Sequence, residues 1–422
     1  MVKERYKEVR VGPQKEIIPK NWEVKALSDI GKFINGKGFS SSDWEEDGLP
    51  IVRIQNLNDE EAEYNYYSED VKDRYYLKNG DILLSWSASL GAYKWKRGNA
   101  ILNQHIFKVL PKDNIDKEFM YQLLLVTIDK LEQKTHGSTM KHIRRKELDL
   151  TFFPLPPLPE QKKIASILSS VDKTIEKTDE VIEKTKELKK GLMQQLLTKG
   201  IGHSDFKEVR IGAKTFFIPK EWTVNSLSKL SDLQGGYAFK SKNYVQSGLK
   251  LLKIQNVQRK NINWEDVSYL PSKYLDKNEK YILSKDDIVI AMTRPIISSG
   301  LKVARIKEND ILLNQRVGKF NIKNEVNSDF MYQYFLSKIF TDEIDKMLST
   351  TNQPNISRKK ILSINIIVPP LEEQKKIASI LSSVDKKIKK EEEYKAKLER
   401  LKKGLMQKLL TGEIRVNTES EV

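Results

Sequence analysis

The feature that most constrains the fold is a segment that occurs twice. Residues 160–173 and 373–386 have the same fourteen-residue sequence, EQKKIASILSSVDK. At an offset of 213 (373 − 160), 28 of the 39 positions in residues 160–198 are identical in the second copy. A repeat of this length predicts a chain built twice from the same unit.

Each copy has the pattern of a long amphipathic helix. Apolar residues recur at steps of three, four or seven, which is coiled-coil spacing. These residues predict one apolar stripe along each helix. In the first copy the stripe continues from Leu188 after a shift of phase. The first stripe comprises Ile164, Leu168, Val171, Ile175, Ile182, Leu188, Leu192 and Leu196. The second comprises Ile377, Leu381, Val384, Ile388, Leu398, Leu401, Leu405 and Leu409.

Prolines precede both copies and a glycine follows each, so both helices have a defined start and stop. Each should contain about 40 residues and be about 60 Å long. Two such helices in one chain can bury their stripes against each other. The alternative is that each helix packs on its own domain.

The rest of the chain is repeated with insertions. Residues 6–12 (YKEVRVG) resemble 206–212 (FKEVRIG), and FMYQ at 119–122 recurs at 330–333. We therefore predict an α+β protein in which two similar mixed α/β domains are joined by two long antiparallel coiled-coil helices, with a pseudo-two-fold internal repeat. The predicted segments are a first domain at 1–155, a first helix at 156–200, a second domain at 201–368, a second helix at 369–415 and a tail at 416–422.

Inside each domain, short runs rich in Ile, Val and Phe predict strands, and one amphipathic pattern predicts a helix. In the first domain the predicted strands are 49–54, 80–85 and 101–110, followed by a helix at 116–133. In the second domain they are 249–254, 287–292 and 311–322, followed by a helix at 328–348.

The charge favours a polyanionic partner. The chain has 74 Lys and Arg against 58 Asp and Glu, a formal net charge of +16. Nucleic acid is the favoured partner, and an acidic protein or a lipid surface is the alternative. The chain has no cysteine, which excludes a disulfide framework and a thiolate zinc site.

No known catalytic pattern occurs in the sequence. It contains no P-loop, no Asp/Asn-Pro-Pro-aromatic motif and no dinucleotide fingerprint. We predict no catalytic residue, no metal site and no cofactor. The sequence has no 18-residue apolar run and no N-terminal signal pattern, which predicts a cytoplasmic protein without a membrane segment.

Polar residues in the connections have the side chains that contact phosphates and base edges in duplex DNA. A plain turn or surface role is the alternative for each, above all for the two Gln-Asn pairs. The first-domain candidates are Gln55, Asn56, Ser85, Trp86, Ser87, Asn103, Gln104, His105, Ser138, Thr139, Lys141, His142, Arg144 and Arg145. The second-domain candidates are Gln255, Asn256, Thr293, Arg294, Asn314, Gln315, Arg316, Thr351, Asn352, Gln353, Asn355 and Arg358.

The sequence resembles the specificity subunits of Type I restriction–modification systems. The resemblance rests on residues 154–168 (PLPPLPEQKKIASIL), residues 367–381 (IVPPLEEQKKIASIL), the two GLMQ helix ends and the two FMYQ segments. It implies that each domain is a target-recognition domain that reads one half of a split, asymmetric site in double-stranded DNA. The coiled coil would then set the spacing between the halves.

The resemblance also implies partners. Two modification subunits, which carry S-adenosylmethionine and methylate adenine, would dock on the chain, and restriction subunits with ATP-driven translocation would join them. The chain itself would catalyse nothing. The residues assigned either to partner docking or to the coiled-coil seam are Gln161, Ile164, Leu168, Val171, Ile175, Leu192, Gln374, Ile377, Leu381, Val384, Ile388 and Leu405.

Two other functions remain as alternatives at this stage. One is a coiled-coil adaptor whose basic charge binds an acidic protein. The other is a self-sufficient DNA methyltransferase or nuclease with an atypical site.

Overall fold

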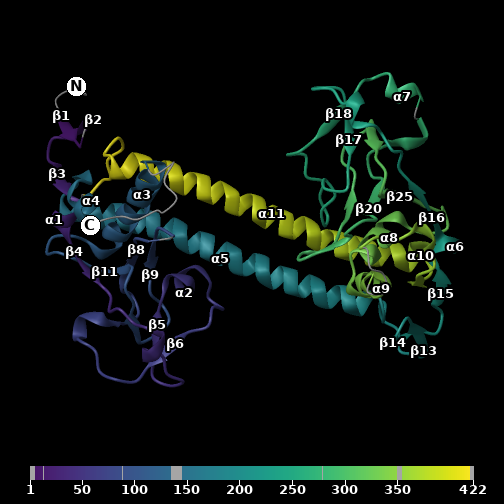
Figure 1. Cartoon of the computed structure of the whole chain (residues 1–422), viewed down its shortest axis with the longest axis horizontal. Coiled ribbons are helices and arrows are strands. Elements are labelled where there is room, and N and C mark those ends of the chain that lie inside the picture. Colours follow the sequence, from purple (N-terminus) through teal and green to yellow (C-terminus); the bar gives the residue numbers. More distant parts are fainter. Residues whose placement is uncertain are drawn as a thin grey trace. The chain divides into compact units, whose positions relative to one another are not determined.

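The computed structural model describes residues 5–12, 14–87, 89–134, 145–277, 279–348 and 354–418, without the side chains of residues 129–134, 145 and 277. The chain forms two compact units (Figure 1). Unit 1 comprises Met1–Glu180 and Glu393–Val422, and unit 2 comprises Val181–Glu392. Two long helices, α5 (Leu158–Leu196) and α11 (Leu371–Leu410), each contribute one part to unit 1 and the other part to unit 2.

Unit 1 contains two four-stranded sheets, in the orders β6-β5-β10-β7 and β4-β11-β8-β9, and the two-stranded pairs β1-β2 and β12-β3. Its remaining elements are β1 (Tyr6–Val11), β2 (Gln14–Pro19), β3 (Glu23–Ala26), α1 (Leu27–Ile30), β4 (Gly31–Asn35), β5 (Leu49–Val52), α2 (Ile54–Asn58), β6 (Asn65–Tyr67), β7 (Tyr76–Leu77), β8 (Ile82–Ser85), β9 (Gly91–Lys94), β10 (Ala100–Leu102), β11 (Ile106–Pro111), α3 (Lys117–Lys134), α4 (Arg145–Asp149) and β12 (Phe152–Leu155).

Unit 2 repeats this plan with the sheets β18-β17-β24-β19 and β16-β25-β20-β23, the pairs β13-β14 and β15-β26, and an added hairpin β21-β22. Its elements are β13 (Phe206–Ile211), β14 (Lys214–Pro219), β15 (Thr223–Ser226), α6 (Leu227–Leu230), β16 (Ser231–Gly235), β17 (Leu249–Leu252), β18 (Ser268–Leu270), α7 (Tyr274–Lys277), β19 (Ile282–Leu283), β20 (Ile288–Ala291), β21 (Ile296–Ile297), β22 (Gly300–Leu301), β23 (Val303–Arg305), β24 (Ile311–Leu313), β25 (Val317–Ile322), α8 (Ser328–Phe335), α9 (Lys338–Leu348), α10 (Arg358–Leu362) and β26 (Asn365–Val368).

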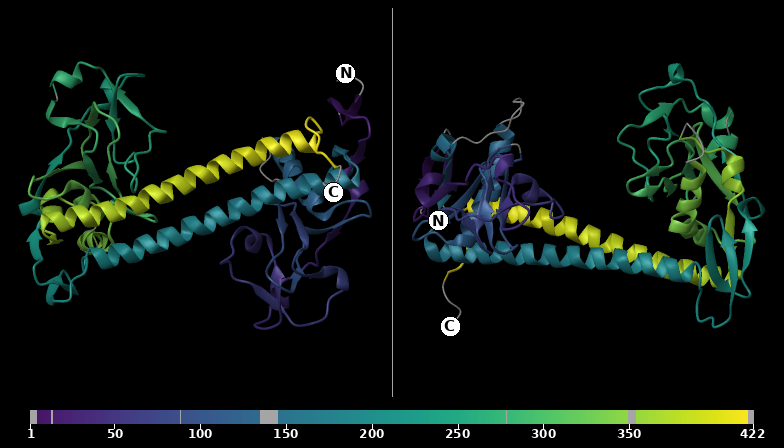
Figure 2. Two further views of the ribbon diagram at one scale, coloured as in Figure 1. Left: turned by 180° about the vertical axis from the view of Figure 1, so that it is seen from behind. Right: turned by 60° about the horizontal axis from the view of Figure 1, so that its bottom comes forward.

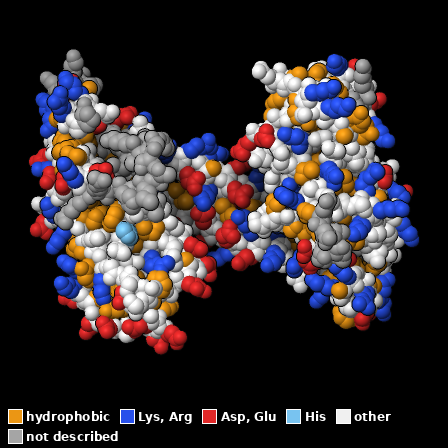
Figure 3. Space-filling view, viewed as in Figure 1, with side chains coloured by type: hydrophobic (Ala, Val, Ile, Leu, Met, Phe, Trp, Pro, Cys, Tyr) orange, Lys and Arg blue, Asp and Glu red, His pale blue; other side chains and the backbone are white. Residues whose placement is uncertain are grey.

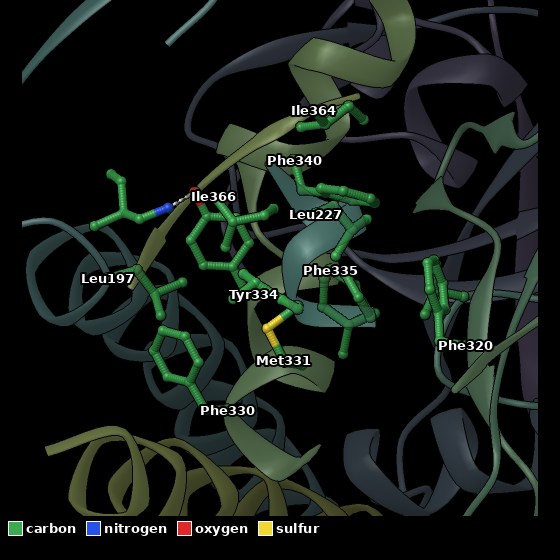
Figure 4. Packing of buried hydrophobic residues seen from close by; sticks show 14 of the residues in the cluster. Leu197, Leu227, Phe320, Phe330, Met331, Tyr334, Phe335, Phe340, Ile364 and Ile366 are labelled. Carbon is green, nitrogen blue, oxygen red and sulfur yellow. Dashed lines mark hydrogen bonds between the residues drawn. The ribbon is translucent and has the colours of Figure 1, made fainter. Parts of the chain in front are cut away.

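The central strand of each unit is buried on both faces. In β20, Ile288 and Ile290 face the cluster formed with α8 and α9, whereas Val289 and Ala291 face a second cluster. Successive strand residues point to opposite faces, so this continuous apolar run is what a strand between two cores requires. Figure 4 shows the first of these cores, in which the Tyr334 hydroxyl accepts a hydrogen bond of 3.2 Å from the Ile367 backbone N–H.

Two predicted strands are wrong because each is two strands. The predicted strand 101–110 is β10 and β11, which belong to different sheets, and 311–322 is likewise β24 and β25. A turn that separates the strands has His105 in one domain and Arg316 in the other at positive φ, 74° and 67°. The predicted helix 328–348 also divides, into α8 and α9, whereas the helix predicted at 116–133 is confirmed as α3.

The two long helices are confirmed, and their inward stripe is regular. Within each unit the two helix segments run side by side in both views of Figure 2. Antiparallel ion pairs join them: in unit 1, Asp172 with Lys402 at 2.5 Å and Asp179 with Lys395 at 2.6 Å, and in unit 2, Lys189 with Asp385.

The predicted change of phase before Leu188 is wrong. Leu188 and its counterpart Leu401 are 57% and 52% exposed, whereas Thr178, Thr185 and Lys189 are buried. The steps of four and three therefore continue from Ile164 through these polar residues to Leu196, with Lys189 in the inward position next to Leu188. The threonine hydroxyls donate to the carbonyls four residues earlier, so the burial of these groups does not leave donors unpaired.

Candidate nucleic-acid interface and helix junctions

The Asn-Gln turn that follows β10 and β24 joins the two sheets of each domain. In the first domain the Gln104 N–H donates to the Lys37 carbonyl at 2.8 Å, and in the second the Gln315 N–H donates to the Tyr237 carbonyl at 2.9 Å. The neighbouring Gly36 is required here, since a Cβ on it would stand 2.1 Å from the Asn103 carbonyl oxygen. The turn is thus fixed from both sides while the side chains of Gln104 and Gln315 are exposed.

In the first domain, aromatic rings gather beside this turn. Trp86 lies against the His105 ring at 4.9 Å between ring centroids and stacks on the Phe107 ring at 5.7 Å. The Trp86 indole N–H donates to Asn35 Oδ1 at 3.2 Å. Trp86, Gln104 and His105 are three of the fourteen candidates predicted in the first domain, and the structure brings these three residues together.

In the second domain, Met292 and Arg316 stand at the positions of Trp86 and His105, and the two residues that follow Met292 are polar and basic. The Arg294 N–H donates to the Pro354 carbonyl at 2.7 Å, and Thr293 forms an isolated bridge with Asn355. The Met292 N–H donates to the Arg316 carbonyl at 2.8 Å. The predicted residues that follow β20 therefore lie beside the Asn-Gln turn. On the face drawn in Figure 3, Lys and Arg side chains are spread across this unit.

Several candidates have structural roles that do not favour direct contact with DNA. Asn56 is fully buried, and its amide bonds to the Arg53 N–H and to the Ala62 and Glu63 carbonyls. Asn256 is 2% exposed and bonds in the same way. Ser85 is buried and donates to the Ser89 carbonyl at 2.6 Å, and Ser87 is also buried.

The remaining candidates differ in exposure and in whether the structure describes them. The side chains of Gln55 and Gln255 are exposed, and each bonds within its own turn. Asn103 and Asn314 are half-buried at the Asn-Gln turns. Nine candidates, or their side chains, lie outside the described residues: Ser138, Thr139, Lys141, His142, Arg144, Arg145, Thr351, Asn352 and Gln353.

The repeated Glu-Gln at the start of α5 connects the helix to the first domain. Glu160 is 3% exposed and accepts from the Trp22 indole N–H at 3.1 Å, and it pairs with Arg415 from the segment that follows α11. The Gln161 amide accepts from the Asp116 N–H at 2.9 Å, directly before α3. Glu160 and Gln161 therefore connect the start of α5 both to the first domain and to the segment that follows α11.

Unit 2 repeats these contacts. Glu373 accepts from the Trp222 indole N–H at 2.9 Å and contacts His203 Nε2 at 2.9 Å, from the segment that follows α5. The Gln374 amide accepts from the Asn327 N–H at 2.8 Å. Gln161 and Gln374, which were assigned to docking or the seam, are each 1% exposed and hold their own domains.

The apolar residues assigned to docking or to the coiled-coil seam are all buried or half-buried, and Ile164, Leu168, Ile377 and Leu381 lie in the domain cores together with residues of both long helices. Those in the interior are Ile164, Leu168, Ile377, Leu381 and Ile388, and those half-buried are Val171, Ile175, Leu192, Val384 and Leu405.

A second repeated contact lies where the helices pass the domain core. In unit 2, Asp385 pairs with Lys189, accepts from Gln333 Nε2 at 3.0 Å and pairs with Lys260 at 3.0 Å. The glutamine is the last residue of the FMYQ repeat. In unit 1 the same positions give Asp172 with Lys402 at 2.5 Å and with Gln122 at 2.7 Å.

Burial and the nearby charge of Lys260 lower the pKa of Lys189 to about 8, despite its ion pair. Burial alone would raise the pKa of Asp385, but its hydrogen bond and charge interactions with Lys189 and Lys260 outweigh burial and lower it. Sequence reasoning missed these lysine–aspartate–glutamine clusters, although the repetition of all three residues was a signal that could have located them.

Among the described residues, no group of three or more His, Cys, Asp or Glu side chains could hold a metal ion. Within the same residues, no helix is both long and apolar enough to cross a membrane.

Comparison with known proteins agrees with the internal repeat. The family described as "Type I restriction modification DNA specificity domain" matches residues 19–187 and again residues 219–400. The Type I restriction enzyme MjaVIII specificity subunit of Methanocaldococcus jannaschii is 36% identical over 94% of this chain and 94% of its own length. The putative MjaX specificity subunit of the same organism is 30% identical over 98% of both chains.

Solved structures share the fold at low sequence identity. The S subunit of a Type I restriction–modification system from M. genitalium superposes with a TM-score of 0.57 at 16% identity, over 92% of this chain and 96% of that chain. A chain solved in work on complex assembly and conformational transition of the type I R-M system gives 0.52 at 16% identity, over 94% and 99%. On the strength of the doubled family match and its full-length relatives, the chain belongs to the family of the Type I restriction modification DNA specificity domain.

Proposed function

We propose that this chain is the DNA sequence-specificity subunit of a Type I restriction–modification complex. Each recognition domain, proposed at residues 1–155 and 201–368, reads one half of a bipartite, asymmetric site. The chain is non-catalytic, and it acts in the cytoplasm with the subunits that modify and restrict the DNA.

The main support for this proposal is that the two domains share the backbone arrangement of the Asn-Gln turn but have different side chains beside it. The Asn-Gln turn has the same backbone hydrogen bonds in both domains. Beside it, the first domain has Trp86 and His105, and the second has Met292 and Arg316. Two domains of one fold with different surface chemistry suit two different DNA sequences.

The long helices supply the spacing in this proposal. The 39 residues of α5 correspond to about 60 Å at about 1.5 Å per residue. Half-sites read on one face of B-DNA are separated by about 34 Å per turn of the duplex. A helical pair of this length is therefore sufficient to separate two readers by one or more turns.

Two modification subunits dock on the helices in this proposal. Leu188 and Leu401 are exposed at equivalent positions of the two repeats, each next to a lysine of the seam. Val181 in α5 and Ile380 and Tyr394 in α11 are exposed as well, and exposed apolar residues that gather in a patch suit a protein partner. Because the same surface occurs twice, it would bind the same partner twice.

The test uses the full chain co-expressed with the adenine methyltransferase subunit that it partners. Sequencing of methylated bases in the host should give one bipartite motif. Gln104→Ala should alter only one half of that motif, and Gln315→Ala only the other. A change in both halves from either substitution would contradict the assignment of one domain to one half-site.

A further inference from the structure

A hollow of about 650 Å³ lies in unit 2 beside the end of β16 and the turn between β24 and β25. Arg316, Arg358, Asp232 and Asn321 line it, and all four are exposed. Small-ligand sites have volumes of roughly 300–1,000 Å³, so the hollow has room for the edge of a base pair.

The two arginines are available for an external partner. Over the described ranges, the guanidinium groups of Arg316 and Arg358 make no ion pair and no hydrogen bond. Arg316 stands at a positive φ of 67° at the exposed end of its turn. The stem of Arg358 passes the backbone of Gly235, where a Cβ would stand 3.6 Å from Arg358 Cδ.

The hollow combines donors with acceptors, which favours a base pair over a phosphate. A phosphate presents only acceptors. Lys280, Arg316 and Arg358 around the hollow would attract it, but it would offer no donor to the carboxylate of Asp232. A G·C pair presents the O6 and N7 acceptors of guanine beside the N4 amino donor of cytosine in the major groove. Arginine binds the first two atoms with two hydrogen bonds, and a carboxylate accepts from the third.

The first domain has different chemistry at the same positions. The pair Asp232 and Asn321 on β16 and β25 corresponds to Lys32 and Leu110 on β4 and β11. Arg316 corresponds to His105, which lies against the Trp86 ring. The Asp232 carboxylate and the Arg316 guanidinium are thus specific to the second domain, whereas Arg358 corresponds to Arg145 in the sequence of the first.

We propose that this hollow reads a G·C pair in the half-site of the second domain. Arg316 donates to guanine O6 and N7, Asp232 accepts from cytosine N4, and Arg358 supports the guanine side. The proposal rests on the DNA-reading function proposed above and deepens it by naming one base pair and the residues that specify it.

The test compares Arg316→Lys with Arg316→Ala in the full chain, co-expressed with its methyltransferase subunit. Lysine retains the charge that a phosphate needs but loses the planar two-bond geometry that guanine needs. Both variants should lower the preference for guanine at one position of one half-site by about 5- to 100-fold and leave the other half unchanged. Arg210→Lys, on the exposed face of β13 in the same unit, is the matched control and should leave the whole motif unchanged.

Two results would overturn the proposal. One is an unchanged motif in both variants. The other is a uniform loss of methylation at every site that lysine restores, because that pattern belongs to a phosphate contact. If a variant methylates nothing, its binding preference is measured by selecting DNA from a randomised duplex library at low salt. A retained preference for guanine in that selection would also overturn the proposal. If the unaltered chain itself yields no bipartite motif, the proposed function fails. If the unaltered chain yields the motif but the variants do not change it, only the proposal for the hollow fails.

Discussion

Removing the Asp385 carboxylate should destabilise unit 2 more than the matched change destabilises unit 1. In Asp385→Ala, the buried ammonium of Lys189 loses its counter-ion, and the Lys260 ammonium that also pairs with Asp385 remains beside it. The Lys189 side chain is only 5% exposed, so water cannot replace the lost partner well.

The expected loss is about 3 kcal/mol. Removing one partner of a buried pair costs roughly 3–5 kcal/mol, and we take the lower end because the Asp385 side chain is 30% exposed. In unit 1, Lys402 is 17% exposed and Asp172 has one lysine partner, so Asp172→Ala should cost about 1–2 kcal/mol. The double variant Lys189→Leu with Asp385→Leu should recover part of the loss, since no buried charge is left but the buried Gln333 amide loses both partners.

Hydrogen exchange read by mass spectrometry suits this test, because two units need not unfold together. A loss of about 3 kcal/mol corresponds to a fall in protection of about 150-fold. The fall should appear in peptides from residues 181–196 and 371–392 and be small in peptides from unit 1. Equal effects of the two alanine variants, or no recovery in the double variant, would refute the reasoning from burial.

Three further predictions concern pH, docking and spacing. The pKa of Lys189 is about 8 in the folded chain and 10.5 in an ordinary lysine. Between these values the unfolded chain holds one more proton, so the stability of unit 2 should rise from about pH 8 to about pH 10. Urea unfolding should detect this rise in stability, and the rise should disappear in Lys189→Met. The double variant Leu188→Ser with Leu401→Ser should change stability by less than about 0.5 kcal/mol yet weaken binding of the methyltransferase subunit in pull-down assays. The control Leu168→Ser, at a fully buried position, should destabilise unit 1. Unaltered binding in the double variant would contradict the proposed docking surface. Insertion of one heptad, about 10 Å, into both long helices should lengthen the spacer of the methylated motif, and an unchanged spacer would contradict the role of the helices.

The sequence was sufficient for the helices, because their apolar spacing is set by local geometry. It was not sufficient for the inward position of Lys189. Lysine is ordinarily exposed, and its partner Asp385 lies far along the chain. Leu188 was the natural choice for the stripe from sequence alone, and it proved to be exposed.

The division of 101–110 into two strands was also beyond sequence reasoning. Apolar residues stand on both sides of the polar turn residues Asn103, Gln104 and His105, and the positive φ falls on His105 rather than on a glycine. For the candidate interface, residue type identified the Asn-Gln turns but could not separate the exposed Gln104 from the buried Asn56, since both are amides of the kind that reads DNA.

Exchange of one domain for a second copy of the other tests the central claim most directly. A chain in which residues 205–368 are replaced by residues 5–155 should methylate a motif whose second half is the inverted copy of the first, because the two helices are antiparallel. If the second half of the motif stayed as it is in the unaltered chain, the domains would not be the readers of the two half-sites.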